Sequence, residues 1–261
     1  MHLRLIKLIP ILLGFAPADP TGTASELVDT KEIIEVVESA KPGPLFEFNI
    51  TTDWNSRYVS EGRDNLDGDS LLGITIEAAY VFLPFGAITL GTWYAWTPAS
   101  TAFAELDAWA EYSLEIGNFE AYAGYKHLRF YPYDVHENEI GAGAAYELPL
   151  AFAVGGDWYY SFATDGSFFE LFIERGCEVT PWLVLTPAVI MGFNAGYRPE
   201  GHDGANNVIT SLTMAIPVTN HIEIAGYVAY NWAIDSNAAR YPGDEQLKDF
   251  FFGGVGLSLS F

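Results

Sequence analysis

Acidic side chains recur at alternate positions along several segments of the chain, and this spacing is its clearest chemical signal. Glu105, Asp107 and Glu111 share one parity in a single segment, as Glu139 and Glu147 do in a later one. Residues two apart on a β-strand point to the same side, so these carboxylates would gather on one face. Grouped carboxylates favour cations over anions. The predicted acidic face consists of Glu105, Asp107, Glu111, Glu120, Lys126, Glu139, Glu147, Glu170, Glu174 and Glu223.

The overall charge limits the classes of partner. The chain holds 12 lysines and arginines against 34 aspartates and glutamates, which gives a formal net charge of −22. Nucleic acid is a poor partner for such a chain, because phosphate contacts need a basic surface. Cys177 is the single cysteine, so no intramolecular disulfide is possible and we expect a packed, unreactive side chain.

The elements that position the carboxylates are predicted strands whose opposite face is apolar. In residues 104–116, Leu106 and Tyr112 alternate with Asp107 and Glu111. A period of two indicates a strand with different surroundings on its two sides. About twelve such segments are predicted, at 45–57, 70–82, 86–97, 102–116, 118–131, 137–148, 150–163, 167–179, 182–194, 205–217, 221–234 and 249–261.

The connections between these segments alternate in kind. Short ones, such as GN at 117–118, alternate with longer ones rich in turn formers and charge, such as YVSEGRDNLDGD at 58–69. Short turns at one end and long loops at the other are typical of a transmembrane barrel. We therefore predict an all-β fold, an antiparallel up-and-down transmembrane β-barrel of about twelve strands over residues 44–261, with both ends of the barrel domain on the short-turn side.

The last segment, FFFGGVGLSLSF at 250–261, alternates apolar with small residues up to its final aromatic. In hydrocarbon each unpaired backbone group costs several kcal/mol, so this strand is expected to pair with 45–57 and close the barrel. Aromatic residues also gather near predicted strand ends, Trp93, Trp96 and Trp158 among them. Such residues predict two girdles at the membrane interfaces.

The N-terminal residues differ from the barrel in composition. A basic start, MHLRLIK, precedes an apolar run from Leu8 to Ala18 that contains the small residues Ala16 and Ala18. This pattern predicts a secretory signal peptide over residues 1–18. Residues 19–43 include DTKEIIEVVESAKPG, with apolar residues at helical spacing before a proline and a glycine. They are expected to form a leader or a short helix.

One predicted strand interrupts the alternation. In residues 118–131, Lys126 lies on the acidic face with Glu120, but His127 and Arg129 fall on the face that should be apolar. A β-bulge adds one residue to one strand and shifts the faces of those that follow. We therefore expect a bulge in this segment.

Ser56, Tyr58 and Gly62 carry a resemblance to a known family. The stretch SRYVSEG at 56–62 resembles the S-x-Y-x-x-R-G element of the TorF-family porins, and EAYAGYKHLRFYP and EIGAGAAYE resemble middle strands of that family. The chain departs from the pattern at Glu61, where the family tends to place arginine, and Arg63 follows the glycine instead. The resemblance implies a bacterial outer-membrane barrel in contact with lipid and lipopolysaccharide, and it transfers no catalytic residues.

The final residue carries a second resemblance. A C-terminal aromatic such as Phe261 looks like the insertion signal of bacterial outer-membrane proteins. This likeness implies that the last strand contacts the barrel-assembly machinery and that the protein resides in the outer membrane.

The acidic face favours a channel as the function. Unpaired carboxylates in a dry interior cost several kcal/mol each, together more than the roughly 5–15 kcal/mol by which a typical domain is stable. The acidic face is therefore expected to line a hydrated lumen, and rings of Asp and Glu favour cations there. The hypothesis is a porin-like channel for passive diffusion of small solutes, preferring cations, without cofactor, bound metal or enzymatic activity.

Two alternatives remain open. A structural or surface-binding barrel without transport would use oxygen-rich loops such as RDNLDGDS at 63–70 and EGHDGANN at 200–207. An outer-membrane lipid hydrolase would need a serine beside a histidine. Spacing singles out no such pair among the candidates His127, His136, His202, Ser161 and Ser167.

Overall fold

The computed structural model of the protein describes residues 46–82, 86–99 and 103–261. The predicted signal peptide at 1–18 and the predicted leader at 19–43 lie outside these described residues. No helix in the described part of the chain is long and apolar enough to cross a membrane.

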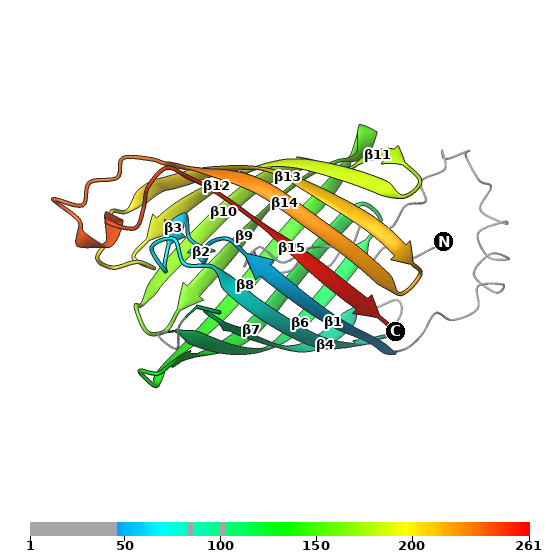
Figure 1. The fold of residues 1–261 in the computed structure, drawn as a ribbon, viewed down its shortest axis with the longest axis horizontal. Coiled ribbons are helices and arrows are strands. Elements are labelled where there is room, and N and C mark those ends of the chain that lie inside the picture. Colours follow the sequence, from blue (N-terminus) through cyan, green and yellow to red (C-terminus); the bar gives the residue numbers. More distant parts are fainter. Residues whose placement is uncertain (1–45, 83–85, 100–102) are drawn as a thin grey trace, which may run out of the picture.

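Twelve long antiparallel strands form a closed barrel, as the alternation predicts (Figure 1). Each strand pairs with its sequence neighbours, and the ring closes where β1 pairs with β15. The strands are β1 (Phe46–Asn55), β4 (Leu71–Val81), β5 (Ala87–Trp96), β6 (Ala104–Ile116), β7 (Phe119–Tyr131), β8 (Val135–Leu148), β9 (Phe152–Ser161), β10 (Gly166–Arg175), β12 (Leu183–Ala195), β13 (Gly204–Thr219), β14 (Ile222–Ala233) and β15 (Phe250–Ser260).

Shorter elements complete the described fold. The predicted strand at 167–179 is divided at Gly176 into β10 and β11 (Cys177–Thr180), and both pair with β12. The hairpin of β2 (Val59–Ser60) and β3 (Arg63–Asp64) lies in the first loop, between β1 and β4. Two 3₁₀ turns, Pro149–Ala151 and Pro242–Asp244, lie in connections between wall strands.

The two ends of the barrel differ in the length of their connections, and the last strand is paired along both of its edges as expected (Figure 1). Long connections such as 234–249 lie at one end, and tight turns such as 117–118 and 220–221 lie at the other, together with Phe261. The backbone groups of Phe48 and Phe261 exchange two hydrogen bonds, of 3.1 and 2.9 Å. This pairing leaves the final strand without an open edge, which hydrocarbon requires.

The outer face of the barrel is apolar. Along β5, Ile88, Leu90 and Tyr94 are exposed, whereas Ala87 and Ala95 at the intervening parity are buried. Exposed aromatic residues border both ends of the wall, among them Trp96 and Trp232 at the long-loop end and Phe46, Phe119 and Phe261 at the short-turn end. A closed barrel with an apolar exterior and aromatic borders fits a membrane-spanning β-barrel.

Two expectations about side-chain direction were wrong. Trp93 does not belong to the outer girdle, because it shares the inward parity of Ala95 and packs against Tyr58. No bulge interrupts β7, which pairs in continuous register with β6 and β8 from Phe119 onward. His127 and Arg129 therefore lie on the outer face near the long-loop end, where the strand continues past its apolar residues.

Candidate functional site

All ten predicted acidic-face residues lie at inward parity on the wall. Glu105, Asp107, Glu139 and Glu170 are buried, and the others are partly buried. Within the described wall strands, Lys126 is the basic residue of the inner face. The interior of the barrel therefore carries far more acid than base along its wall.

Lys126 is the centre of the inner acidic cluster. Its Nζ lies 3.4 Å from Glu139 Oε2, on the neighbouring strand β8, and 3.9 Å from Asp107 Oδ2, on β6. Glu105 Oε2 accepts a hydrogen bond of 2.7 Å from the Tyr58 hydroxyl. Lys126 is therefore the basic partner that Asp107 and Glu139 share.

The remaining predicted carboxylates extend this acidic surface along the wall. Glu170 pairs across strands with Asp157, which accepts a hydrogen bond of 2.8 Å from the Tyr122 hydroxyl. Glu223 lies beside Ser258 on β15. The residues on the strand halves nearer the short turns are Glu120, Glu147, Glu174 and Glu223, and Glu111 lies between them and the Lys126 cluster along β6.

The loop after β1 folds into the barrel, which the sequence reading missed. This segment, residues 56–70, is called here the inner loop. Its Val59 packs with inward residues of β12 to β15, including Ile190, Ile209 and Phe252. Its Tyr58 packs on the other side against Trp93 of β5 and Phe103. Because these contacts lie on separated parts of the wall, the inner loop crosses the lumen and narrows it.

The three residues of the family-like motif anchor the inner loop. Ser56 exchanges hydrogen bonds with the backbone of Gly253, at 2.8 and 3.0 Å. Tyr58 reaches Glu105, as described above. Gly62 has a φ of +69°, and a Cβ there would overlap the side chain of Asn207. Only glycine satisfies both the backbone angle and the close approach.

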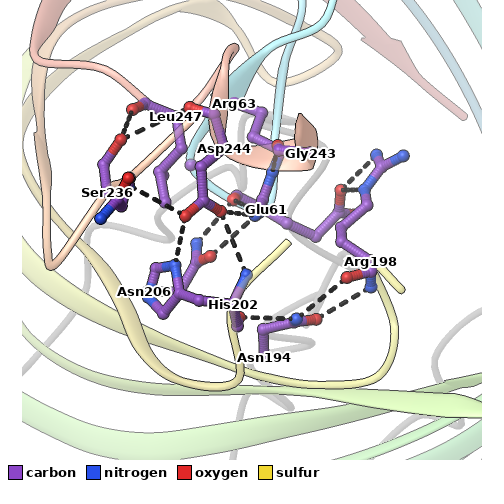
Figure 2. Close-up of polar contacts among 12 residues, drawn as sticks. Glu61, Arg63, Asn194, Arg198, His202, Asn206, Ser236, Gly243, Asp244 and Leu247 are labelled. Carbon is purple, nitrogen blue, oxygen red and sulfur yellow. Dashed lines mark hydrogen bonds and ion pairs between the residues drawn. The ribbon is translucent and has the colours of Figure 1, made fainter. Parts of the chain in front are cut away.

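Arg63 and Asp244 tie the inner loop to two other loops (Figure 2). Arg63 is 1% exposed, and it donates to Asn206 Oδ1 at 2.9 Å and to the Gly243 carbonyl at 2.9 Å. Its Nη2 lies 3.3 Å from Asp244 Oδ1. Asp244 also accepts hydrogen bonds from the backbone N–H and the Nδ1 of His202, at 3.2 and 2.8 Å. Residues 56–70, 196–203 and 234–249 therefore share one buried polar network.

A second ion pair joins the inner loop to residues 196–203. Arg198 Nε donates to Glu61 Oε2 at 3.0 Å, and Nη2 donates to the same oxygen. Burial raises the pKa of Glu61, but the Arg198 guanidinium and the Ser60 hydroxyl reverse this and leave the pKa below its usual range. The carboxylate of Glu61 in turn raises the pKa of Arg198. Both groups are therefore charged at neutral pH.

The same loop continues to the acidic cluster on the opposite wall. Tyr197, next to Arg198, donates a hydrogen bond from its hydroxyl to Glu139. The polar chain thus runs from Glu61 through residues 197–198 to Glu139 and Lys126. This arrangement forms a constriction with charged groups on both its loop side and its wall side.

The candidate hydrolase residues do not come together within the described structure. His127 and His136 lie on the outer face, where their rings stack with centroids 5.4 Å apart. His202 is buried, and its ring nitrogens bond to Asp244 and to the Ala205 carbonyl. Ser161 and Ser167 bond instead to the backbone N–H of Ala163 and to the Trp158 indole. In the described residues, no three His, Cys, Asp or Glu side chains are placed to hold a metal ion.

Solved structures share the barrel fold. The KdgM porin matches with a TM-score of 0.53 and 8% identity, over 82% of this chain and 99% of that one. An outer membrane channel from Pseudomonas putida F1 matches with a TM-score of 0.53 and 11% identity, over 85% of this chain and 100% of that one. The translocator domain of the autotransporter NalP from Neisseria meningitidis matches with a TM-score of 0.50 and 13% identity, over 88% and 93%.

No family model matches the chain, and the search of curated proteins finds no match. The resemblance to the TorF-family porins therefore stays a prediction. At such low identities, the similarity to porins and channels shows the fold. Together with the apolar outer face, the closed barrel of twelve strands makes this chain an outer-membrane β-barrel of porin-like architecture.

Proposed function

We propose that this barrel is a channel for the passive diffusion of small solutes across the outer membrane and that it prefers cations. The observation that carries the proposal is the inner wall, on which Lys126 faces a large excess of carboxylates. A lumen lined by one sign of charge concentrates ions of the opposite sign. The barrel thus has an interior suited to small cations and neutral polar solutes.

The charged groups of the constriction limit the class of solute that we propose. The inner loop packs on β12 to β15 through Val59, and residues 197–198 continue across to Glu139 on β8, so a solute would have to pass these polar and charged groups. Glu139, Asp157 and Glu170 lie at inward parity on β8, β9 and β10. A KdgM structure is described as a complex with oligogalacturonate, which is a polyanion. The acidic wall of this chain disfavours such a solute by charge repulsion, so we propose a different solute class.

Conductance measurements test the proposal. Purified protein in a planar bilayer under a KCl gradient is expected to open and to give a reversal potential of the sign for K⁺ over Cl⁻. The double variant Glu111→Gln with Glu170→Gln removes acid from the inner wall and is expected to move the reversal potential toward zero. Asp235→Asn removes one acid from an exposed loop and serves as the control. A preference for Cl⁻ in the wild type would contradict the proposal.

A second function is favoured by the constriction itself. Because the polar chain from Glu61 to Lys126 crosses the lumen, a barrel that serves as a structural or surface-binding protein without transport is the alternative. The same bilayer experiment separates the two functions. A wild type without openings, together with a variant lacking residues 57–69 that conducts, would favour the non-conducting barrel.

The partners follow from the same architecture. We propose lipid and lipopolysaccharide around the apolar wall, and recognition of the strand ending at Phe261 by the barrel-assembly machinery. Replacing Phe261 by Ala is expected to lower the amount of folded barrel in the outer membrane, measured by heat-modifiable migration on a gel. An unchanged amount of folded barrel would exclude a role for this residue in assembly.

A further inference from the structure

The outer wall carries a cluster of basic and aromatic side chains on the hairpin of β7 and β8. Arg129 Nε and Nη2 both donate to Asp134 Oδ1, at 3.0 and 2.7 Å. His136 Nε2 lies 3.3 Å from the same oxygen, and His136 Nδ1 lies 3.3 Å from His127 Nε2. The Arg129 guanidinium also lies over the Tyr131 ring, 4.8 Å from its centroid. These contacts hold one arginine and two histidines side by side on the surface.

The position of this cluster on the wall matches the depth of lipid headgroups. Along β7 toward the long-loop end, the outer face reads Ala121, Ala123 and Tyr125, and then His127 and Arg129. The long-loop end of such barrels faces the cell exterior. Tyrosine and tryptophan mark the boundary between hydrocarbon and headgroups. The histidines and Arg129 therefore begin where the hydrocarbon ends, in the outer leaflet.

The cluster gathers exposed basic side chains on a strongly acidic chain, and Asp134 pairs with its arginine. The chain has a formal net charge of −22, and Arg63, Lys126 and Arg198 are engaged inside the barrel or its loops. The side chains of Arg129 and His136 are 40% and 44% exposed. Asp134 binds one edge of the Arg129 guanidinium, and Arg129 Nη1 donates to no other group among the described residues. The ring nitrogens of His127 and His136 contact Asn138, Asp134 and each other, so the remaining edge of the Arg129 guanidinium is the part of the cluster left for an incoming group.

We propose that His127, Arg129 and His136 form a binding site for a phosphate group of lipopolysaccharide in the outer leaflet. Arginine binds phosphate through charge-assisted hydrogen bonds of fixed geometry. Asp134 positions Arg129 and His136 for this contact. The site is on the outer wall and does not depend on whether the lumen conducts.

Lipid binding to the purified, detergent-solubilised barrel tests the proposal. Native mass spectrometry would compare diphosphorylated lipid A with enzymatically dephosphorylated lipid A of the same acyl chains, and the first is expected to bind at least tenfold more tightly. Arg129→Gln, and His127→Gln with His136→Gln, are expected to abolish this preference. Arg175→Gln removes an exposed arginine at the opposite end of the wall and is expected to leave it intact.

The outcomes separate the site from general affinity for lipid. Equal binding of the two lipids by the wild type would overturn the proposal without any variant. An equal loss of the preference in Arg175→Gln and Arg129→Gln would overturn it as well, since the phosphate would then have no defined site. Displacement of lipid A by millimolar inorganic phosphate alone would also contradict it, because it would show a site for a free ion. Heat-modifiable migration checks that every variant is folded.

Discussion

Replacing Asp244 by Asn tests whether the buried network holds the constriction in place. The side chains of Asp244 and Arg63 are 0% and 2% exposed, so their charges are screened little by solvent. Asp244 Oδ1 faces Arg63 and the His202 N–H, and Oδ2 faces His202 Nδ1 and the Asn237 N–H. Burial raises the pKa of Asp244, but the Asn237 and His202 donors outweigh it and keep the carboxylate charged. The side-chain amide of an asparagine at this position would point its own N–H hydrogens at one of these two pairs of donors, so that pair would lose its acceptor.

The magnitude follows from the loss of one member of a buried ion pair. Such a loss costs about 3–5 kcal/mol, because the remaining charge stays buried without its partner. Since each 1.4 kcal/mol is tenfold, the ratio of docked to undocked inner loop is expected to fall roughly 100- to 4,000-fold. Asp235→Asn, an exposed change in the same connection, is the matched control.

Two measurements test the effect of Asp244→Asn on the inner loop. Amide hydrogen exchange of residues 56–70 reports the undocked population, and single-channel conductance reports the width of the lumen. We expect faster exchange confined to the three linked loops and a larger conductance, with the wall strands unchanged. A folded variant in which the exchange of the inner loop and the conductance both match the wild type would refute the reasoning that this network holds the loop.

Further predictions concern the same constriction. Gly62→Ala places a Cβ against Asn207 at a positive φ, and we expect a loss of at least about 1 kcal/mol in loop docking, read by hydrogen exchange. Because the folded pKa of Glu61 lies below its ordinary value of 4.5, its pairing with Arg198 stabilises docking above about that pH and is lost as the pH falls through the folded value. Conductance is expected to rise in acid, and Glu61→Gln should weaken this response; an unchanged response would contradict the assignment. Lys126→Gln should increase the preference for cations, measured as a reversal potential further from zero.

The wall of the barrel was predictable because its determinants are local. Alternation along each strand separates the two faces, so the directions of Glu105 and Leu106 follow from parity alone. The need to pair every backbone group in hydrocarbon then requires closure between the first and last strands. The predicted bulge near His127 and Arg129 was wrong, because the outer face need not stay apolar beyond the hydrocarbon.

The constriction was not predictable from local pattern. Arg63 and Asp244 are 181 residues apart in sequence, and neither has a neighbour that indicates the other. The loop 58–69 has turn formers and charge, which are typical of a solvated connection, yet it is buried through Tyr58 and Val59. A signal was present in Gly62 and in those two apolar residues. Their meaning depends on inward side chains of distant strands, which parity does not bring together.

The location of the partners of Val59 has a consequence for the order of biogenesis. Val59 comes early in the chain, whereas Ile209, Tyr227 and Phe252, which share its buried apolar cluster, belong to strands near the end of the sequence. The inner loop cannot dock in its final position until those strands have paired into the barrel. The inner loop is therefore the final part of this barrel to mature, and protease resistance of residues 57–69 should appear only after the wall has become resistant.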